Sequence, residues 1–107
     1  MIDSHCHLAG DEFVGDLDAV VARAAAAGVG TALVILDASD AAELARAAVV
    51  RGAWPGARFA AGVHPHHAVR FAEDPERAAA VVEAAVETTG ACGVGEIGLD
   101  YHYDFSP

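Results

Sequence analysis

The chain has 107 residues, enough for one small domain, and 54% of them are hydrophobic. Its six basic residues are all Arg, against 16 acidic residues, so the formal net charge is −10. This charge argues against non-specific binding along nucleic acid and against attachment to anionic membranes, although a bound cation can still admit a phosphate-ester substrate.

The first part of the sequence predicts a strand, a helix and a second strand. Residues 1–7 form the first expected strand. Residues 16–27 predict an amphipathic helix, because apolar residues recur on one helical face and Gly28 follows it. Residues 29–36 are a nearly continuous apolar run, which is typical of a parallel strand buried on both faces.

A second helix and a third strand come next. Ser39 or Asp40 can cap a helix that extends to about Val50, because short polar side chains accept hydrogen bonds from the first helical turn. Residues 58–63 are again apolar and predict the third strand.

The last part of the sequence predicts a third helix and a fourth strand. Asp74 is the expected N-cap of this helix, Pro75 suits its first turn, and Glu76 favours the positive end of its dipole. Residues 91–97 predict the fourth strand, and 100–107 form a polar and aromatic loop.

This alternation predicts an α/β protein with a parallel β/α sheet and right-handed crossovers. Two architectures fit: a small open sheet, or the N-terminal half of a (β/α)8 TIM-like barrel, which needs about 250 residues when complete. The sequence stops after the fourth strand on Ser-Pro, a frequent start of a helix. We therefore expect residues 1–107 to be one partial barrel domain with strands one to four, cut short.

Cysteine usage and the N-terminus bear on the cellular compartment. Cys6 and Cys92 form neither a disulfide framework nor a zinc-ribbon spacing, which is typical of thiols in a reducing compartment. The start of the sequence is acidic, and no apolar run has the length of a membrane helix. We therefore expect a cytoplasmic protein without a membrane partner.

Ionisable side chains gather at three of the four predicted strand ends. His5 and His7 are two residues apart on a strand and so share one face, whereas Cys6 projects from the other. His64 follows the third strand, and Glu96 lies at the end of the fourth. Because ligands bind at the carboxyl ends of parallel strands, we expect a site there.

Glu96 is the candidate that most needs a partner. An unpaired carboxylate in an apolar, glycine-flanked strand end would lose its hydration at a cost of several kcal/mol. A cation held by His5 and His7 would offset this cost, and these ligand types suit zinc, manganese or other divalent cations. A carboxylate can also bridge two cations, as in phosphoester hydrolysis. The alternative is a hydrogen-bonded Glu that braces its loop.

Three further residues near these strand ends admit more than one interpretation. We assign His64 to substrate binding, with metal ligation or capping of the turn before Pro65 as alternatives. We expect Asp100 and Tyr101 to orient a ligand by hydrogen bonds, or else to brace their loop.

Three other polar residues are expected to play no direct part. His66 and His67 are predicted to lie on the loop surface. Asp3 shares the face of the two N-terminal histidines, and we expect it to make a buried hydrogen bond inside the barrel, with ligand orientation as the alternative.

Residues 93–98 match GxGxxG, but dinucleotide binding requires these glycines to open a helix directly after a strand. Here they continue an apolar strand, and a polar, aromatic loop follows. We therefore expect the glycines to allow close backbone approach near a site rather than to bind a nucleotide cofactor.

Three segments carry motifs that occur together in one family. They read Met-Ile-Asp-Ser-His-Cys-His-Leu at 1–8, Gly-Val-His-Pro-His at 62–66, and Val-Gly-Glu-Ile-Gly-Leu-Asp-Tyr at 94–101, followed by Asp-Phe-Ser-Pro. In this order and spacing they resemble the TatD-related deoxyribonucleases, metal-dependent hydrolases of the wider amidohydrolase-like barrel group. The resemblance covers essentially the whole chain but only the N-terminal portion of the family's barrel.

The resemblance implies a (β/α)8 barrel with two divalent cations, in which His5 and His7 bind one cation and Glu96 bridges or joins both and serves catalysis. It also implies hydrolysis of DNA phosphodiesters by metal-activated water. The family's other ligands, two histidines and an aspartate, come from later strands, so we expect the isolated chain to be inactive. Many members have Tyr-Tyr-Arg where 101–103 reads Tyr-His-Tyr, which removes one possible phosphate contact.

Two other hypotheses stay open. The chain itself can be a non-catalytic half-barrel that binds metal or associates with itself through the open edges of strands one and four. The intact protein can instead be a barrel hydrolase acting on a small ester or amide. The expected cations are zinc, manganese or magnesium, and the expected partner is DNA or another phosphodiester substrate.

Overall fold

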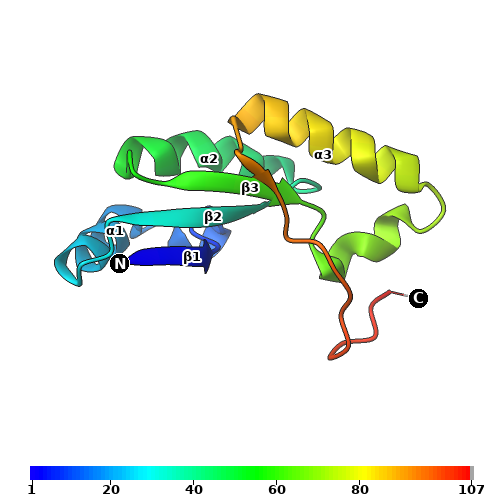
Figure 1. Ribbon diagram of the computed structural model, residues 1–107, viewed down its shortest axis with the longest axis horizontal. Coiled ribbons are helices and arrows are strands. Elements are labelled where there is room, and N and C mark those ends of the chain that lie inside the picture. Colours follow the sequence, from blue (N-terminus) through cyan, green and yellow to red (C-terminus); the bar gives the residue numbers. More distant parts are fainter. Residues whose placement is uncertain (107) are drawn as a thin grey trace.

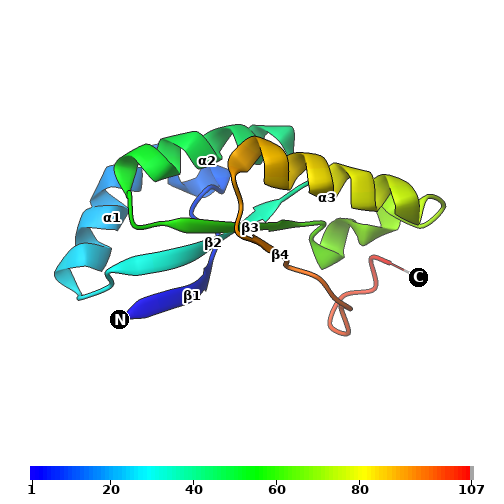
Figure 2. The ribbon, with the colours of Figure 1, turned by 45° about the horizontal axis from the view of Figure 1, so that its top comes forward.

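The computed structural model describes residues 1–106. Four parallel strands form one sheet in the order β1-β2-β3-β4, and the helices lie together on one of its faces (Figures 1 and 2). The chain therefore adds one β/α unit after another along a single direction. The elements are β1 Ile2–Cys6, η1 Asp11–Phe13, α1 Leu17–Ala26, β2 Thr31–Asp37, α2 Ala41–Ala53, β3 Arg58–Gly62, η2 Pro65–Phe71, α3 Pro75–Thr89 and β4 Gly93–Val94.

This α/β pattern is that of the N-terminal half of a TIM barrel, as the sequence predicts. In such a barrel the helices cover the outside of the sheet, and the other face looks toward the barrel axis. Among residues 1–106, no helix combines the length and apolar character needed to cross a membrane.

The hydrophobic core lies between the sheet and its helices. Val34 and Leu36 on β2 pair in register with Phe59 and Ala61 on β3, and all four side chains are almost completely buried. Val50 of α2 packs on them from the helical layer. The centre of the sheet is thus fixed by β2 and β3, from which β1 and β4 extend to either side.

Side-chain caps fix where α2 and α3 begin. The Asp40 carboxylate accepts a hydrogen bond from the Glu43 N–H at 3.1 Å, and the Asp74 carboxylate accepts one from the Arg77 N–H at 3.0 Å. These caps satisfy backbone donors that the first helical turn leaves free. Of the two caps expected for α2, Asp40 is therefore the one used.

Several elements differ from the sequence prediction. Helix α2 continues past Val50 to Ala53, where Pro55 ends it by disfavouring helical geometry in the residue before it. The 3-10 helix η2 was not predicted. Strand β4 covers only Gly93–Val94 rather than 91–97, because only these two residues pair with β3, opposite Ala60 and Ala61.

Candidate metal centre

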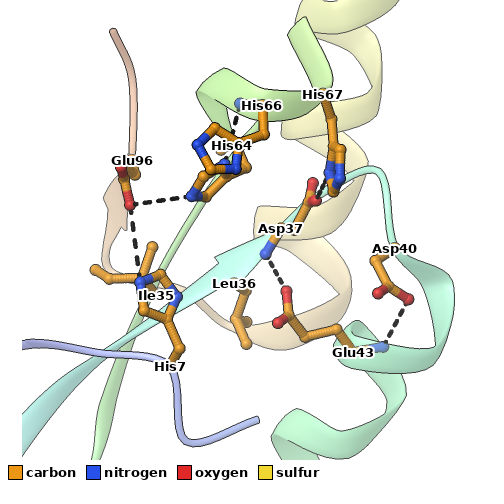
Figure 3. A pocket seen from close by; sticks show the side chains of 11 residues that line it. His7, Ile35, Leu36, Asp37, Asp40, Glu43, His64, His66, His67 and Glu96 are labelled. Carbon is orange, nitrogen blue, oxygen red and sulfur yellow. Dashed lines mark hydrogen bonds and ion pairs between the residues drawn. The ribbon is translucent and has the colours of Figure 1, made fainter. Parts of the chain in front are cut away.

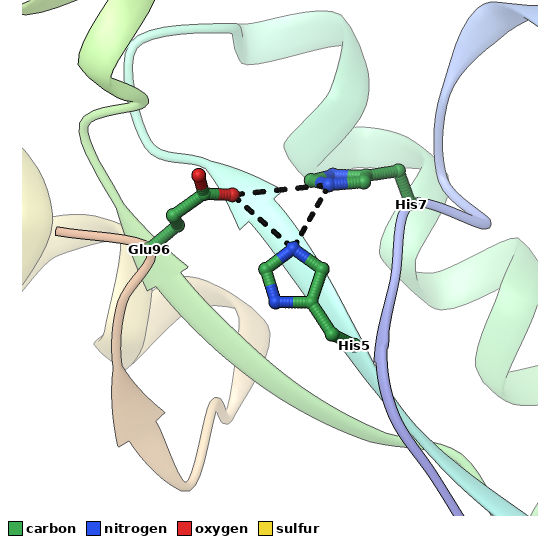
Figure 4. Close-up of side chains that lie close together, drawn as sticks. All are labelled: His5, His7 and Glu96. Atoms are coloured by element: carbon green, nitrogen blue, oxygen red, sulfur yellow. Dashed lines mark hydrogen bonds and ion pairs between the residues drawn. The ribbon is translucent and has the colours of Figure 1, made fainter. Parts of the chain in front are cut away.

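Strand β1 brings two histidines to one face. His5 lies on the strand and His7 just beyond its last residue, and their Nε2 atoms are 3.2 Å apart (Figure 4). The intervening Cys6 turns the other way and packs against the hydrophobic core, as the alternation of side chains predicts. The imidazole pair therefore follows directly from the spacing in the sequence.

Glu96 reaches the same point from the opposite edge of the sheet. Its Oε2 lies 3.2 Å from His5 Nε2 and 3.8 Å from His7 Nε2. Strands β1 and β4 are separated by three inter-strand steps, about 14 Å in a flat sheet. Only a curved sheet and three long side chains pointing inward from both edges close this gap.

The three ligand atoms have a spacing that suits a divalent cation. His5, His7 and Glu96 each offer one ligand atom, and these atoms lie within 4.8 Å of one another. A triangle with sides of 3.2, 3.2 and 3.8 Å has a circumradius of about 2.0 Å, close to Zn–N and Zn–O bond lengths. Two imidazoles and a carboxylate are also a common zinc ligand set, so the residues present fit a metal ion.

Gly62 at the end of β3 allows Glu96 to come this close. A Cβ added to Gly62 would lie 2.7 Å from the Glu96 carbonyl oxygen and 2.8 Å from the Gly95 carbonyl carbon. Both distances are shorter than real Cβ contacts, and both neighbours are backbone atoms that cannot swing away. Close backbone approach was expected at glycines 93–98, whereas the structure requires it at Gly62, the facing residue of β3.

His64 contacts both the carboxylate and the turn before η2. Its Nε2 lies 3.8 Å from Glu96 Oε2, and its Nδ1 accepts a hydrogen bond from the His66 N–H at 3.1 Å. Burial lowers the pKa of His64 although Glu96 opposes this shift. In the neutral ring an accepting Nδ1 leaves the proton on Nε2, so His64 presents a donor to the site rather than a lone pair. His64 therefore caps the turn and also lies beside Glu96, two roles that the sequence presented as alternatives.

A pocket of about 260 Å³ opens beside this cluster (Figure 3). One side is formed by His7, His64 and Glu96, and the other by polar residues that follow β2. This second side was not predicted, because the apolar run that predicts the strand ends at Leu36. The structure extends β2 to Asp37, so all four strand ends carry polar side chains.

Asp37 organises the second side of the pocket. Its Oδ1 accepts hydrogen bonds from the Ser39 N–H and hydroxyl at 2.9 and 2.6 Å, and its Oδ2 contacts Nδ1 of His67. Burial alone would raise the pKa of Asp37, but the hydrogen bonds from Ser39 and His67 outweigh it and hold the pKa below its usual value. Asp37 is therefore an ionised group that orients His67.

Glu43 has the opposite electrostatic setting. Its Oε2 accepts a hydrogen bond from the Asp37 N–H, yet burial raises the pKa of Glu43, and the nearby charges of Asp37 and Asp40 add to the rise. The pocket therefore contains a firmly ionised carboxylate beside one whose charge is disfavoured.

The other predicted residues lie around the cluster rather than in it. His66 and His67, expected on the loop surface, lie in η2, where each contacts a carboxylate. Asp100 accepts hydrogen bonds from the His102 and Tyr103 N–H groups, which hold its pKa below the usual value, and so braces its loop. Tyr101 is 92% exposed.

Asp3 differs from its expectation of a buried hydrogen bond. It is exposed on β1, and its carboxylate accepts a hydrogen bond from the His5 N–H at 3.1 Å. The prediction of burial is wrong because β1 is an edge strand in this structure, with β2 as its partner on one side.

Comparison with known proteins identifies relatives that match nearly the whole chain. It is 37% identical over 107 residues to "3'-5' ssDNA/RNA exonuclease TatD" of Edwardsiella piscicida, and 36% identical over 106 residues to the protein of that name from Citrobacter rodentium. Each alignment covers 99% of this chain but only 39% and 38% of the relative, so the chain spans about two fifths of their length. The family model "TatD related DNase" matches residues 2–107, and the chain therefore belongs to this family.

Proposed function

We propose that His5, His7 and Glu96 form part of the divalent-cation site of a hydrolase that cleaves phosphodiester bonds in nucleic acid. The observation that carries this proposal is the convergence of three ligand atoms from the two opposite edges of the sheet. The printed name of the relatives, single-stranded DNA and RNA exonuclease, supports nucleic acid as the substrate class.

Each residue has a distinct part in this proposal. A bound cation supplies Lewis acidity toward a phosphoryl oxygen and lowers the pKa of water enough to give hydroxide near neutral pH. His5, His7 and Glu96 would hold the cation, each with one ligand atom. His64, neutral with its proton on Nε2, can donate a hydrogen bond to Glu96 or to a substrate phosphate oxygen.

Metal binding by the chain itself is the first test. Titration with Co²⁺, followed by visible absorption, is expected to give saturable binding to the chain. The double variant His5→Ala, His7→Ala should weaken it by more than about 100-fold, because ligand loss exceeds the 10- to 100-fold cost of losing a partner that only orients a ligand. His102→Ala is the matched control, as His102 lies outside the ligand cluster. Equal Co²⁺ affinity in the double variant would overturn the proposal.

Activity is the second part of the same test. We expect the isolated chain to show no turnover, and the chain joined to the remaining C-terminal length of the Edwardsiella piscicida relative to hydrolyse a single-stranded oligonucleotide. A chelator should abolish this hydrolysis and Glu96→Gln should lower it by at least about 100-fold. Hydrolysis of small esters or amides without any cleavage of oligonucleotides would instead favour the small-substrate alternative.

A further inference from the structure

Two aromatic side chains in the loop after β4 form a stacked pair. The rings of Tyr103 and Phe105 have centroids 4.9 Å apart and are inclined by only 5°. Tyr103 is 48% exposed and Phe105 is 51% exposed, so neither ring is part of the hydrophobic core. Half-exposed, parallel rings present a π-face to a planar ligand.

His66 connects this aromatic pair to the pocket of the candidate metal centre. Its ring lies 5.1 Å from that of Tyr103 and 5.2 Å from that of Phe105, edge-on to both. On its other side His66 lies 4.6 Å from the ring of His64 and lines the pocket. The stacked pair therefore lies next to the proposed site of phosphodiester cleavage.

Asp100 holds the pair in position. One carboxylate oxygen accepts hydrogen bonds from the backbone N–H groups of His102 at 2.9 Å and Tyr103 at 3.0 Å. The other lies 3.1 Å from Nε2 of His66. The loop that carries the rings thus lies against the same histidine that the rings contact.

The charge of the chain restricts how it can hold nucleic acid. With 16 acidic residues against six Arg, and with Asp104 between the two aromatic residues, this chain offers few basic side chains for general contacts to phosphate. Stacking of bases on aromatic rings is independent of charge and of base identity. Base stacking is therefore the recognition mode that suits this acidic composition, in addition to phosphate binding by a cation.

We infer that Tyr103 and Phe105 form a stacking platform for an unpaired nucleobase whose neighbouring phosphate lies at the candidate metal centre. The inference rests on the proposed function, and it adds the residues that would bind a base of the nucleic-acid substrate. Such a platform agrees with the single-stranded substrate in the relatives' printed name, because both faces of a base are covered in a duplex, and it discriminates little among the four bases.

The test uses the chain itself and a short single-stranded oligonucleotide that contains one 2-aminopurine, whose fluorescence is quenched by stacking. Binding should quench the probe, and Tyr103→Ala with Phe105→Ala should remove the quenching and lower affinity by roughly 5- to 150-fold. Tyr103→Phe with Phe105→Tyr keeps two rings and should retain both. Tyr101→Ala, which removes a more exposed tyrosine of the same loop, is the matched control.

An oligonucleotide with an abasic site in place of 2-aminopurine makes the result decisive. It should bind the wild-type chain as weakly as the intact oligonucleotide binds the double alanine variant. Equal affinity for abasic and intact oligonucleotides, or no quenching, would overturn the inference. The Co²⁺ titration of the histidine variants reports on the metal centre separately, so failure of the platform and failure of the proposed function give different results.

Discussion

Gly62 determines how near Glu96 can approach the histidines of β1, although Gly62 has no side chain to contribute to the site. The backbone of the segment after β4 occupies the space that a side chain on β3 would need. At this position the identity of the residue acts through the path of a neighbouring strand rather than through its own chemistry.

We predict that Gly62→Ala weakens metal binding by at least about 10-fold, because a shift of about 1 Å in a positioned group can cost up to 100-fold. The added methyl should also lower the free energy of unfolding by about 1–3 kcal/mol, as in other overpacked sites. Co²⁺ titration and urea unfolding measure the two effects. Gly30→Ala is the control, since no described atom lies within 4 Å of a Cβ built there. Unchanged Co²⁺ affinity in the Gly62 variant would contradict this account.

At the scale of elements, the helix caps are the local sequence signals that predict the helix starts most directly. Asp40 and Asp74 occupy their predicted positions, and both accept the expected backbone hydrogen bond. Asp16 precedes α1 in the same way, yet within residues 1–106 its side chain makes no capping hydrogen bond. An aspartate at the start of a helix therefore contributes a capping hydrogen bond to α2 and α3 but, within the described residues, not to α1.

We predict that Asp74→Ala lowers the free energy of unfolding by about 1 kcal/mol, because the Arg77 N–H loses its acceptor. Asp16→Ala should cost clearly less, since no capping bond of the described chain is lost. Chemical denaturation of the two variants under the same buffer gives the comparison. Equal losses would show that charge near the helix dipole, rather than the hydrogen bond, is what matters.

An element could be predicted from the sequence when the residues that determine it are its own, and not when they lie in another element. Apolar runs and caps are local, so β1 to β3 and the three α-helices follow from the residues themselves. The length of β4 depends on which of its residues pair with β3, and η2 depends on His64 and Pro65 acting as cap and first turn. Likewise, His5, His7 and Glu96 could be selected as site residues because they lie at predicted strand ends. Asp37 was not selected, because the second strand was predicted to end one residue before it.

At the scale of the whole molecule, the sheet formed by residues 1–106 has two open edges and carries its helices on one face. Within the described residues β1 pairs with β2 alone, and β4 pairs with β3 alone. Apolar side chains lie exposed at these edges: Ile2 is 70% exposed, Val94 60% and Ile97 74%. Unpaired strand edges that carry apolar side chains favour association with another chain.

We predict that the isolated chain associates with itself, and that its sedimentation coefficient rises with protein concentration. Ile2→Lys and Val94→Lys should shift it toward monomer, because charged residues block edge-to-edge pairing. Val49→Lys, an exposed position on α2 away from the edges, is the control. A single monomeric species at all concentrations would argue against this prediction.

The ligand atoms of the candidate metal centre join the first and last strands of the sheet. A cation held there would act as a cross-link that closes a loop of roughly 90 residues, and closure of long loops removes much of the entropy of an unfolded chain. Because unfolding would separate the ligands, a cation at 100 times its dissociation constant would stabilise the folded chain by about 2.7 kcal/mol. Cation occupancy and sheet curvature would then be linked equilibria: flattening of the sheet would release the ion, and removal of the ion would allow β1 and β4 to exchange their amide hydrogens first.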